Sequence, residues 1–146
     1  MSTLSALLGR GPNGLDAPAP VEFASLILPR SPNACLAAPA DHPGPKQITA
    51  PILPATPDAA FETLLRLTET FPRTWRLAEW PERRQAQWVE RSGLANFPDI
   101  IVAEIVPTPA GTSLFLYSRS LIGHSDLGVN GKRVQRWLDG LAVALR

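Results

Sequence analysis

The sequence predicts an α+β domain: a four-stranded antiparallel sheet with two helices packed on one face and an extended, proline-rich N-terminal arm. Three observations predict it. Eleven of the 16 prolines lie at or before Pro57, two stretches repeat apolar residues at helical spacing, and four β-like segments follow one another without room for crossover helices. Strands joined in this way must pair antiparallel, and the amphipathic helices must bury their apolar faces against one face of the sheet.

Proline divides the chain into parts. Only six of the 27 charged residues lie at or before Pro57, and proline lacks an N–H donor and restricts the residue before it. This argues against long helices and against charge-driven disorder in that part of the chain. The arm should contact the domain through Phe23, Leu26 and Ile52. We therefore expect a flexible tail, an arm packed on the domain and an α+β core domain, at residues 1–20, 21–55 and 56–146.

The two predicted helices have clear boundaries. Thr56 can cap the first, Pro57 suits its first turn, and Pro72 ends it. The apolar residues of this helix recur at helical spacing: Phe61, Leu64, Leu65 and Phe71. The second runs from about residue 131 to residue 145, and its buried face is marked by Val134, Trp137, Leu138, Leu141 and Leu145.

Four segments between the helices have strand character: about Thr74–Trp80, Gln85–Ser92, Ile100–Val106 and Ser113–Ser120. The last two are joined by Thr108-Pro-Ala-Gly111, with proline second and glycine fourth, which is typical of a type I turn. Aromatic residues are usually buried, so we expect much of the core to come from Trp75, Trp88, Phe115 and Trp137.

Composition excludes several classes of function. The formal net charge is +1, and the basic residues are diluted by acidic ones, so nucleic acid is not an expected partner. Cys35 is the single cysteine and the two histidines are far apart in sequence, so we expect neither an internal disulfide nor a metal or other cofactor. No stretch approaches the roughly 20 apolar residues of a membrane span, and the first residues do not form a signal peptide. We expect a cytoplasmic protein.

One dense cluster of special residues follows the last predicted strand. Within twelve positions, around Gly123 and Gly128, lie Arg119, Ser120, His124, Ser125, Asp126 and Asn130. A strand that ends in a tight polar loop and is followed at once by a helix is a suitable place for a binding site, and equally for a structural corner.

This cluster carries a family resemblance. The stretch Ser118-Arg-Ser-Leu-Ile-Gly-His-Ser-Asp-Leu-Gly-Val-Asn-Gly-Lys-Arg133 resembles R-S-x-x-G-x-S-D-x-G-V-N-x-x-R of the bacterial and plastid family called domain of unknown function 1499. Ser31-Pro-Asn33 resembles the Ser-Pro-Asn-Cys of many members, but Ala34 takes the cysteine position and Cys35 comes one residue late. The resemblance covers roughly Pro29 to the end of the chain. It implies a domain but no reaction.

Two interpretations of the cluster stay open. In the first, it is a brace in which Arg119 pairs with Asp126 and Asn130 caps the final helix. In the second, Arg119 and Arg133 hold a small anion beside the N–H groups of the helix start. Ser31-Pro-Asn33 forms a turn and can also dock the arm against the C-terminal loop.

The predicted function is that of a non-catalytic binding or accessory domain, which holds a small anionic ligand or a protein partner at the 119–133 corner. The candidate ligand-binding residues are Arg119, Ser125, Asp126, Asn130 and Arg133. The alternative is a hydrolase-like enzyme that uses His124, Ser125 and Asp126, although adjacent residues rarely form a triad and no Gly-x-Ser-x-Gly motif occurs. A Ser125 hydroxyl bonded only to backbone would count against the enzyme, and an exposed apolar patch at Leu94, Phe97 and Ile100 would favour a protein partner.

Overall fold

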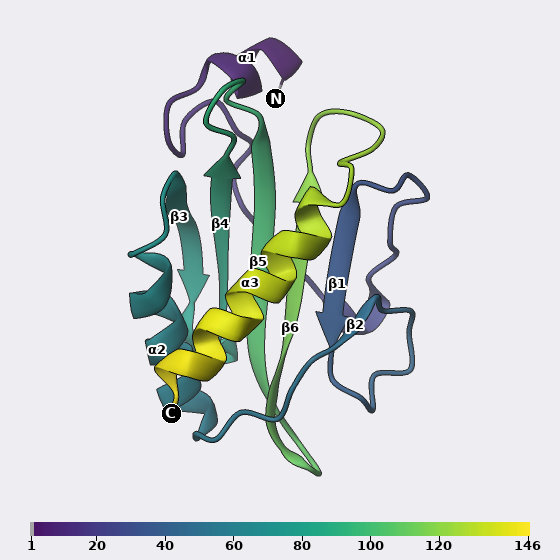
Figure 1. Ribbon diagram of the computed structural model, residues 1–146, viewed down its shortest axis with the longest axis vertical. Helices are drawn as coiled ribbons and strands as arrows, with labels where there is room; N and C mark the ends of the chain where they lie inside the picture. Colours follow the sequence, from purple (N-terminus) through teal and green to yellow (C-terminus); the bar gives the residue numbers. More distant parts are fainter. Residues whose placement is uncertain (1) are drawn as a thin grey trace.

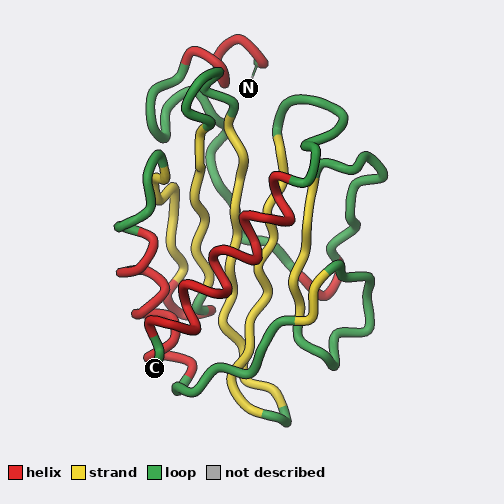
Figure 2. Tube along the Cα trace, in the orientation of Figure 1, coloured by secondary structure: helices red, strands yellow, loops and turns green. Residues whose placement is uncertain are grey.

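The fold is defined by six strands and three α-helices in a computed structural model that describes residues 2–146. The strands are Ala34–Ala38 (β1), Ile48–Thr49 (β2), Thr74–Trp80 (β3), Gln85–Arg91 (β4), Pro98–Thr108 (β5) and Gly111–Ser120 (β6). The α-helices are Thr3–Leu8 (α1), Pro57–Thr68 (α2) and Val129–Ala144 (α3), with short 3₁₀ turns at Phe23–Ser25 (η1) and Pro81–Arg83 (η2). The strands form one sheet in the order β2-β1-β6-β5-β4-β3 (Figures 1 and 2).

The predicted fold class was therefore wrong, although the four strands β3 to β6 lie where they were expected and pair antiparallel. The sheet is mixed, because β1 pairs antiparallel with β6 while β2 pairs parallel with β1. The two extra strands come from the proline-rich arm. Its five residues Ala34–Ala38 fit between Pro32 and Pro39, and they satisfy the backbone groups that β6 would otherwise leave bare at the edge of the sheet.

Helices α2 and α3 cover the same face of the sheet (Figure 1), as the sequence predicted. The centre of this core is an edge-to-face pair of Trp88 and Trp137, with ring centroids 5.2 Å apart. The Trp88 indole N–H donates to Thr68 Oγ1 at 3.1 Å, so its polar atom is satisfied in the core. Of the other two predicted core aromatics, Trp75 is 38% exposed and Phe115 lies on the opposite face of the sheet.

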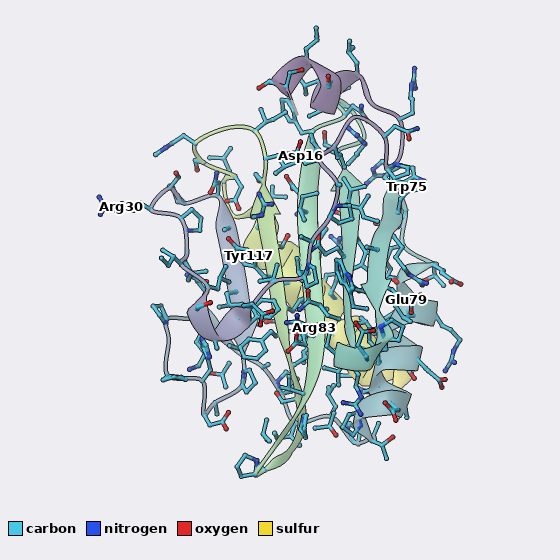
Figure 3. All side chains as sticks on the ribbon, turned by 180° about the vertical axis from the view of Figure 1, so that it is seen from behind. Asp16, Arg30, Trp75, Glu79, Arg83 and Tyr117 are labelled. Carbon is cyan, nitrogen blue, oxygen red and sulfur yellow. The ribbon has the colours of Figure 1, made fainter. Side chains whose placement is uncertain are left out.

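That opposite face is covered by the segment before β1. Phe23 of η1 stacks on Phe115 with ring centroids 4.6 Å apart, and the buried residues beneath it include Leu36, Val102 and Tyr117. Figure 3 shows this face, crossed by the segment that contains Asp16 and η1. Of the other two arm contacts that the sequence predicted, Leu26 packs against this cluster, whereas Ile52 is half exposed and its neighbour Leu53 is buried instead.

The first residues of the chain contact one end of the sheet through main-chain carbonyls. The Arg91 guanidinium donates to the carbonyl oxygens of Ala6 (2.6 Å), Gly11 (2.8 Å) and Asn13 (2.8 Å). Asn96 donates to those of residues 7 and 9. These contacts give residues 6–13 a fixed place in the structure. The division into a flexible tail, an arm and a core remains a prediction, which the truncation described in the Discussion tests.

Among residues 2–146, no helix combines the length and the apolar character that crossing a bilayer requires.

Candidate functional site

The corner between β6 and α3 is organised by the Asp126 carboxylate. Its Oδ1 accepts the backbone N–H of Gly128 at 2.7 Å, and its Oδ2 accepts the backbone N–H of Asn130 at 3.2 Å. Gly128 precedes the helix with φ 84°, a left-handed conformation that favours glycine. Burial acts to raise the pKa of Asp126, but hydrogen bonds from Asn130 and Gly128 outweigh it and hold that pKa below its usual value. Asp126 thus caps α3.

Asn130 was expected to be this cap, and that expectation was wrong. The helix begins at Val129, two residues before the predicted start, so Asn130 lies in the first turn. Its side chain is fully buried. Its amide N–H group donates to three oxygens: Asp126 Oδ2 at 2.7 Å, Ser120 Oγ at 2.8 Å and the Asn33 carbonyl at 3.0 Å. Its amide oxygen accepts from the Ser118 hydroxyl and from Arg133. Asn130 therefore joins α3 to β6 and to the residue before β1.

Arg133, one turn further along α3, is the charged centre of the same network. Only 5% of the residue is exposed. Its Nε lies 2.7 Å from Glu90 Oε2, and its Nη1 lies 2.8 Å from Asp99 Oδ2. The other Glu90 oxygen pairs with Arg136 at 2.8 Å. Two buried carboxylates thus neutralise Arg133, which leaves its charge without need of an external anion.

The Asp99 carboxyl is held in an unfavourable environment. Burial raises the pKa of Asp99 above its usual value, and Glu90 adds to the rise, while the charge and hydrogen bonds of Arg133 and a hydrogen bond from Ser120 oppose it. The ionised form of Asp99 therefore depends on Arg133 for its stability.

The structure separates Arg119 from the rest of the predicted site. Successive residues of β6 face opposite sides of the sheet, and Ser118 faces α3, where its hydroxyl contacts Asn130. Arg119 therefore projects from the other face, where it lines a hollow of about 240 Å³ with Leu77, Ile100, Val102 and the chain at residues 15–21. We call this the back hollow. Within residues 2–146 the expected Arg119–Asp126 ion pair does not occur, so the brace hypothesis was wrong for Arg119.

The hydrolase hypothesis gains no support from the geometry of the loop. The Ser125 hydroxyl accepts the backbone N–H of Leu127 at 3.3 Å, and in the described part of the chain no side-chain base donates to it or accepts from it. His124 is exposed in the same loop. Ser125 therefore shapes the turn that leads into α3, which is the arrangement that counts against a nucleophile.

Docking of the arm on the C-terminal loop, one of the two roles considered for Ser31-Pro-Asn33, is confirmed. The Asn33 amide donates to the Gly123 carbonyl at 3.0 Å, and the backbone N–H of Asp126 donates to the Pro32 carbonyl at 3.2 Å. Cys35, two residues later, is buried in the core under α3. Burial raises the pKa of its thiol, and the Asp126 charge raises it further, so Cys35 is stabilised as a neutral thiol.

Sequence reasoning missed Glu90, Asp99 and Ser118, which complete the network around Arg133. A usable signal was present for Glu90, because it is two residues from Trp88 on one strand and must share its buried face. Ser118 follows the apolar Leu114 and Leu116 at the same spacing. For Asp99 no local pattern exists, since its partner is 34 positions away on α3. Among residues 2–146, no three or more His, Cys, Asp or Glu side chains gather in a way that could hold a metal ion.

Replacing Asp126 with alanine should cost about 1–2 kcal/mol of folding free energy, because it removes the cap of α3 and one acceptor of Asn130. A carboxyl with a lowered pKa stabilises the folded state above its ordinary pKa, and loses that contribution as the pH falls through the lowered value. The difference between wild type and variant in urea melts should therefore shrink in acid. Asp139→Ala is the matched control, because Asp139 is exposed on the same helix and accepts only from Gln135. Equal losses in the two variants would contradict the capping role.

Comparison with known proteins agrees with this architecture. The crystal structure of protein MLL2253 from Mesorhizobium loti matches with a TM-score of 0.50 at 12% identity, covering 77% of this chain and 96% of that one. The crystal structure of protein CV1439 from Chromobacterium violaceum matches with a TM-score of 0.51 at 14% identity, covering 78% and 98%. At such identities the likeness concerns the fold alone. No curated protein matches the chain.

The family comparison extends over most of the chain. The model described as "Protein of unknown function (DUF1499)" matches residues 27–141, from the segment before β1 to the last turns of α3. The matched region contains the whole sheet, α2, the corner around Asp126 and Asn130, and the Glu90–Arg133–Asp99 network. The chain therefore belongs to the DUF1499 family, as its C-terminal motif predicted.

Proposed function

We propose that this protein is a non-catalytic binding domain for a small anion with an apolar body, and that the ligand occupies the back hollow. One observation carries the proposal. Arg119 is half buried among apolar residues, and within residues 2–146 its guanidinium has no hydrogen bond or ion pair. A half-buried cation without a partner is costly, and an anionic ligand would relieve that cost.

The walls of the back hollow favour an apolar body on the ligand. Leu15 and Val21 line it from the N-terminal segment, and Ile100 and Val102 line it from β5. The charge of Arg119 also acts on Tyr117, which is buried on the same face of the sheet. Burial raises the pKa of the Tyr117 hydroxyl, and the Arg119 charge opposes that rise. A carboxylate at Arg119 with its hydrocarbon against the apolar walls satisfies both parts of the hollow.

Two further side chains bear on the choice of ligand. Asp16 also lines the hollow and has interactions of its own. Because two carboxylates repel each other, the ligand carboxylate must lie beside Arg119 and away from Asp16. The amide of Gln87 donates to the Ala19 carbonyl, which ties the covering segment to β4. A ligand in the back hollow should therefore stabilise residues 15–21 as well as Arg119.

The corner itself is a weaker anion site than the sequence suggested. The Asp126 carboxylate already accepts two N–H groups at the start of α3, those of Gly128 and Asn130, and Glu90 and Asp99 already neutralise Arg133. In this proposal Ser125, Asp126, Asn130 and Arg133 shape the corner, and Arg119 alone of the predicted residues binds the anion. The cytoplasmic, bacterial setting expected from the sequence remains a prediction.

Thermal shift and calorimetry with sodium octanoate test the proposal. At about ten times Kd, binding should stabilise the wild type by roughly 1.4 kcal/mol, a rise of a few degrees in Tm. Octanol lacks the charge and inorganic phosphate lacks the apolar body, so both should shift Tm less. Arg119→Met should abolish the octanoate shift. Arg30→Met is the control, because Arg30 is exposed and projects from the edge of the molecule (Figure 3). An unchanged octanoate shift in Arg119→Met would overturn the proposal.

A further inference from the structure

One end of the molecule gathers apolar side chains that point into solvent. Figure 1 shows α1, the loop between β4 and β5, and the loop between β6 and α3 at the same end of the sheet. Ten large hydrophobic side chains are exposed among the described residues, and six of them lie on these three segments or on the first residue of α3. We call these six the apolar tips: Leu4, Leu8, Leu94, Phe97, Leu127 and Val129.

Five of the six apolar tips line two adjoining hollows, and the sixth, Leu4, lies on α1 beside them. Leu8 and Leu94 line a hollow of about 360 Å³, and Phe97, Leu127 and Val129 line a neighbouring hollow of about 300 Å³. Ser92 belongs to both hollows, so they adjoin. Leu94 is fully exposed at 102% and Leu127 is exposed at 89%. A cluster of apolar groups this bare on one end marks a contact surface, whereas single exposed leucines are common on any protein.

The hollow lined by Leu8 and Leu94 is basic. Arg10, Arg73 and Arg91 line it together with Trp75, and no carboxylate does. Arg91 is buried and donates hydrogen bonds to backbone carbonyls, but Arg10 and Arg73 are exposed. Gly93 lies beside the Arg73 side chain, since a Cβ on Gly93 would be in van der Waals contact with the Arg73 guanidinium at 3.6 Å. This hollow therefore combines two exposed arginines with an indole and exposed leucines, and one of these arginines, Arg73, donates its Nε–H to the Arg91 carbonyl at 3.1 Å.

The acidic side chains near this end already form ion pairs or hydrogen bonds within the protein. Glu90 and Asp99 are buried against Arg133, and Asp126 caps α3. Towards the other end of the sheet the balance is different, since Asp58 pairs with Arg84 there and Glu22 pairs with Arg83. Around the apolar tips, the three arginines of the basic hollow thus outnumber the one ionised carboxylate, Asp126, that has no ion-pair partner among residues 2–146, although the whole chain carries a net charge of only +1.

We propose that this end of the domain binds the surface of an anionic lipid bilayer, inserting the apolar tips while Arg10 and Arg73 contact lipid phosphates. The observations favour a membrane over a protein partner. The tips come from separate segments and are 45–102% exposed, and exposed arginines and an indole lie beside Leu8 and Leu94. Interfacial binding combines buried apolar area with attraction to anionic lipid, and tryptophan and arginine suit the headgroup level. The surface shares no residue with the back hollow, so this inference is independent of the proposed function.

Vesicle co-sedimentation of the full chain tests the inference. The wild type should bind vesicles of phosphatidylcholine mixed with phosphatidylglycerol at least tenfold more tightly than vesicles of phosphatidylcholine alone, and added salt should reduce that preference. Leu94→Ser with Leu127→Ser should weaken binding to the mixed vesicles at least tenfold. Arg10→Gln with Arg73→Gln should remove the preference for anionic lipid and leave weak, salt-independent binding.

The matched control is Ile27→Ser with Val143→Ser, because both residues are exposed, at 89% and 58%, but lie outside the three segments. This control should bind as the wild type does. All four positions of the two serine variants are exposed, and unchanged melting temperatures would show that the variants fold. Absence of wild-type binding at low salt, or equal losses in the control, would overturn the inference. A dimer or protein complex that Leu94→Ser with Leu127→Ser disrupts, with no vesicle binding, would assign the surface to a protein partner instead.

Discussion

Replacing Arg133 with alanine should lower the free energy of unfolding by roughly 3–5 kcal/mol, because it strands two buried carboxylates at once. Glu90 and Asp99 both pair with this guanidinium at less than 3 Å, and their side chains are nearly as buried as its own. Asn130 and Ser118 would also lose a donor. Urea denaturation followed by tryptophan fluorescence measures the loss, since Trp88 and Trp137 lie in the adjacent core.

Arg136→Ala provides the control for this variant. Arg136 pairs with the same Glu90 carboxylate, but its side chain is 56% exposed, so its loss should cost less than about 1 kcal/mol. Combining Arg133→Met with Glu90→Gln and Asp99→Asn should recover part of the stability, because no charge is then left alone. A single Arg133→Ala variant as stable as Arg136→Ala would show that the network contributes little.

The pH dependence of the Arg133→Ala variant has a definite sign. A raised pKa means that folded Asp99 binds its proton more tightly than the unfolded chain does. Its contribution to stability is therefore fully present below the ordinary aspartate pKa and is lost as the pH rises through the raised value. Without Arg133 the pKa of Asp99 rises further, so the loss of its contribution to stability continues to higher pH. The difference between wild type and variant should be smaller at about pH 5 than at about pH 8.

Replacing Arg91 with methionine should cost roughly 3 kcal/mol or more. The residue is 2% exposed, and its guanidinium donates to the carbonyls of Ala6, Gly11, Asn13 and Asn96. Burial lowers the pKa of Arg91, because loss of water disfavours its charged form. The released N-terminal segment should become sensitive to limited proteolysis.

Deleting residues 2–18 should have a related effect, a fall of several degrees in Tm, because it leaves the buried Arg91 charge without these partners. In the Arg91→Met background the same deletion should cost little more, since both changes remove one set of contacts. An unchanged Tm on deletion in the wild-type background would instead support the flexible tail that the sequence predicted for residues 1–20.

The parts of the fold that could be predicted are those with strong periodicity. Strands β3 to β6 and helices α2 and α3 each carry an apolar repeat or a clear stop signal. Strand β1 does not: Ala-Cys-Leu-Ala-Ala has no β-branched residue and little strand preference of its own. It is a strand because β6 offers it a partner, which is information that lies more than 70 residues away in the sequence.

The candidate site shows both an avoidable and an unavoidable failure. Arg119 and Ser118 are neighbours on a strand, so they could not both face α3, and alternation from the apolar Leu114 and Leu116 already places Ser118 on the helix side. The pairing of Arg133 with Asp99 was beyond reach, because it depends on the register between β4 and β5 and on where α3 crosses them. Local sequence patterns predict which face of a strand or helix a residue occupies, whereas the tertiary fold decides which residue it contacts across the core.

The position of β1 at the side of β6 also imposes an order on folding during synthesis. Strand β1 emerges from the ribosome early, yet its antiparallel partner consists of residues 111–120, so it must wait for most of the chain. An unpaired apolar strand in that interval is an aggregation hazard. The alanine-rich strand and its flanking prolines, Pro29, Pro32, Pro39, Pro43 and Pro45, make a poor template for other strands. The low strand preference that made β1 hard to predict thus also protects the nascent chain from aggregation until β6 has been synthesised.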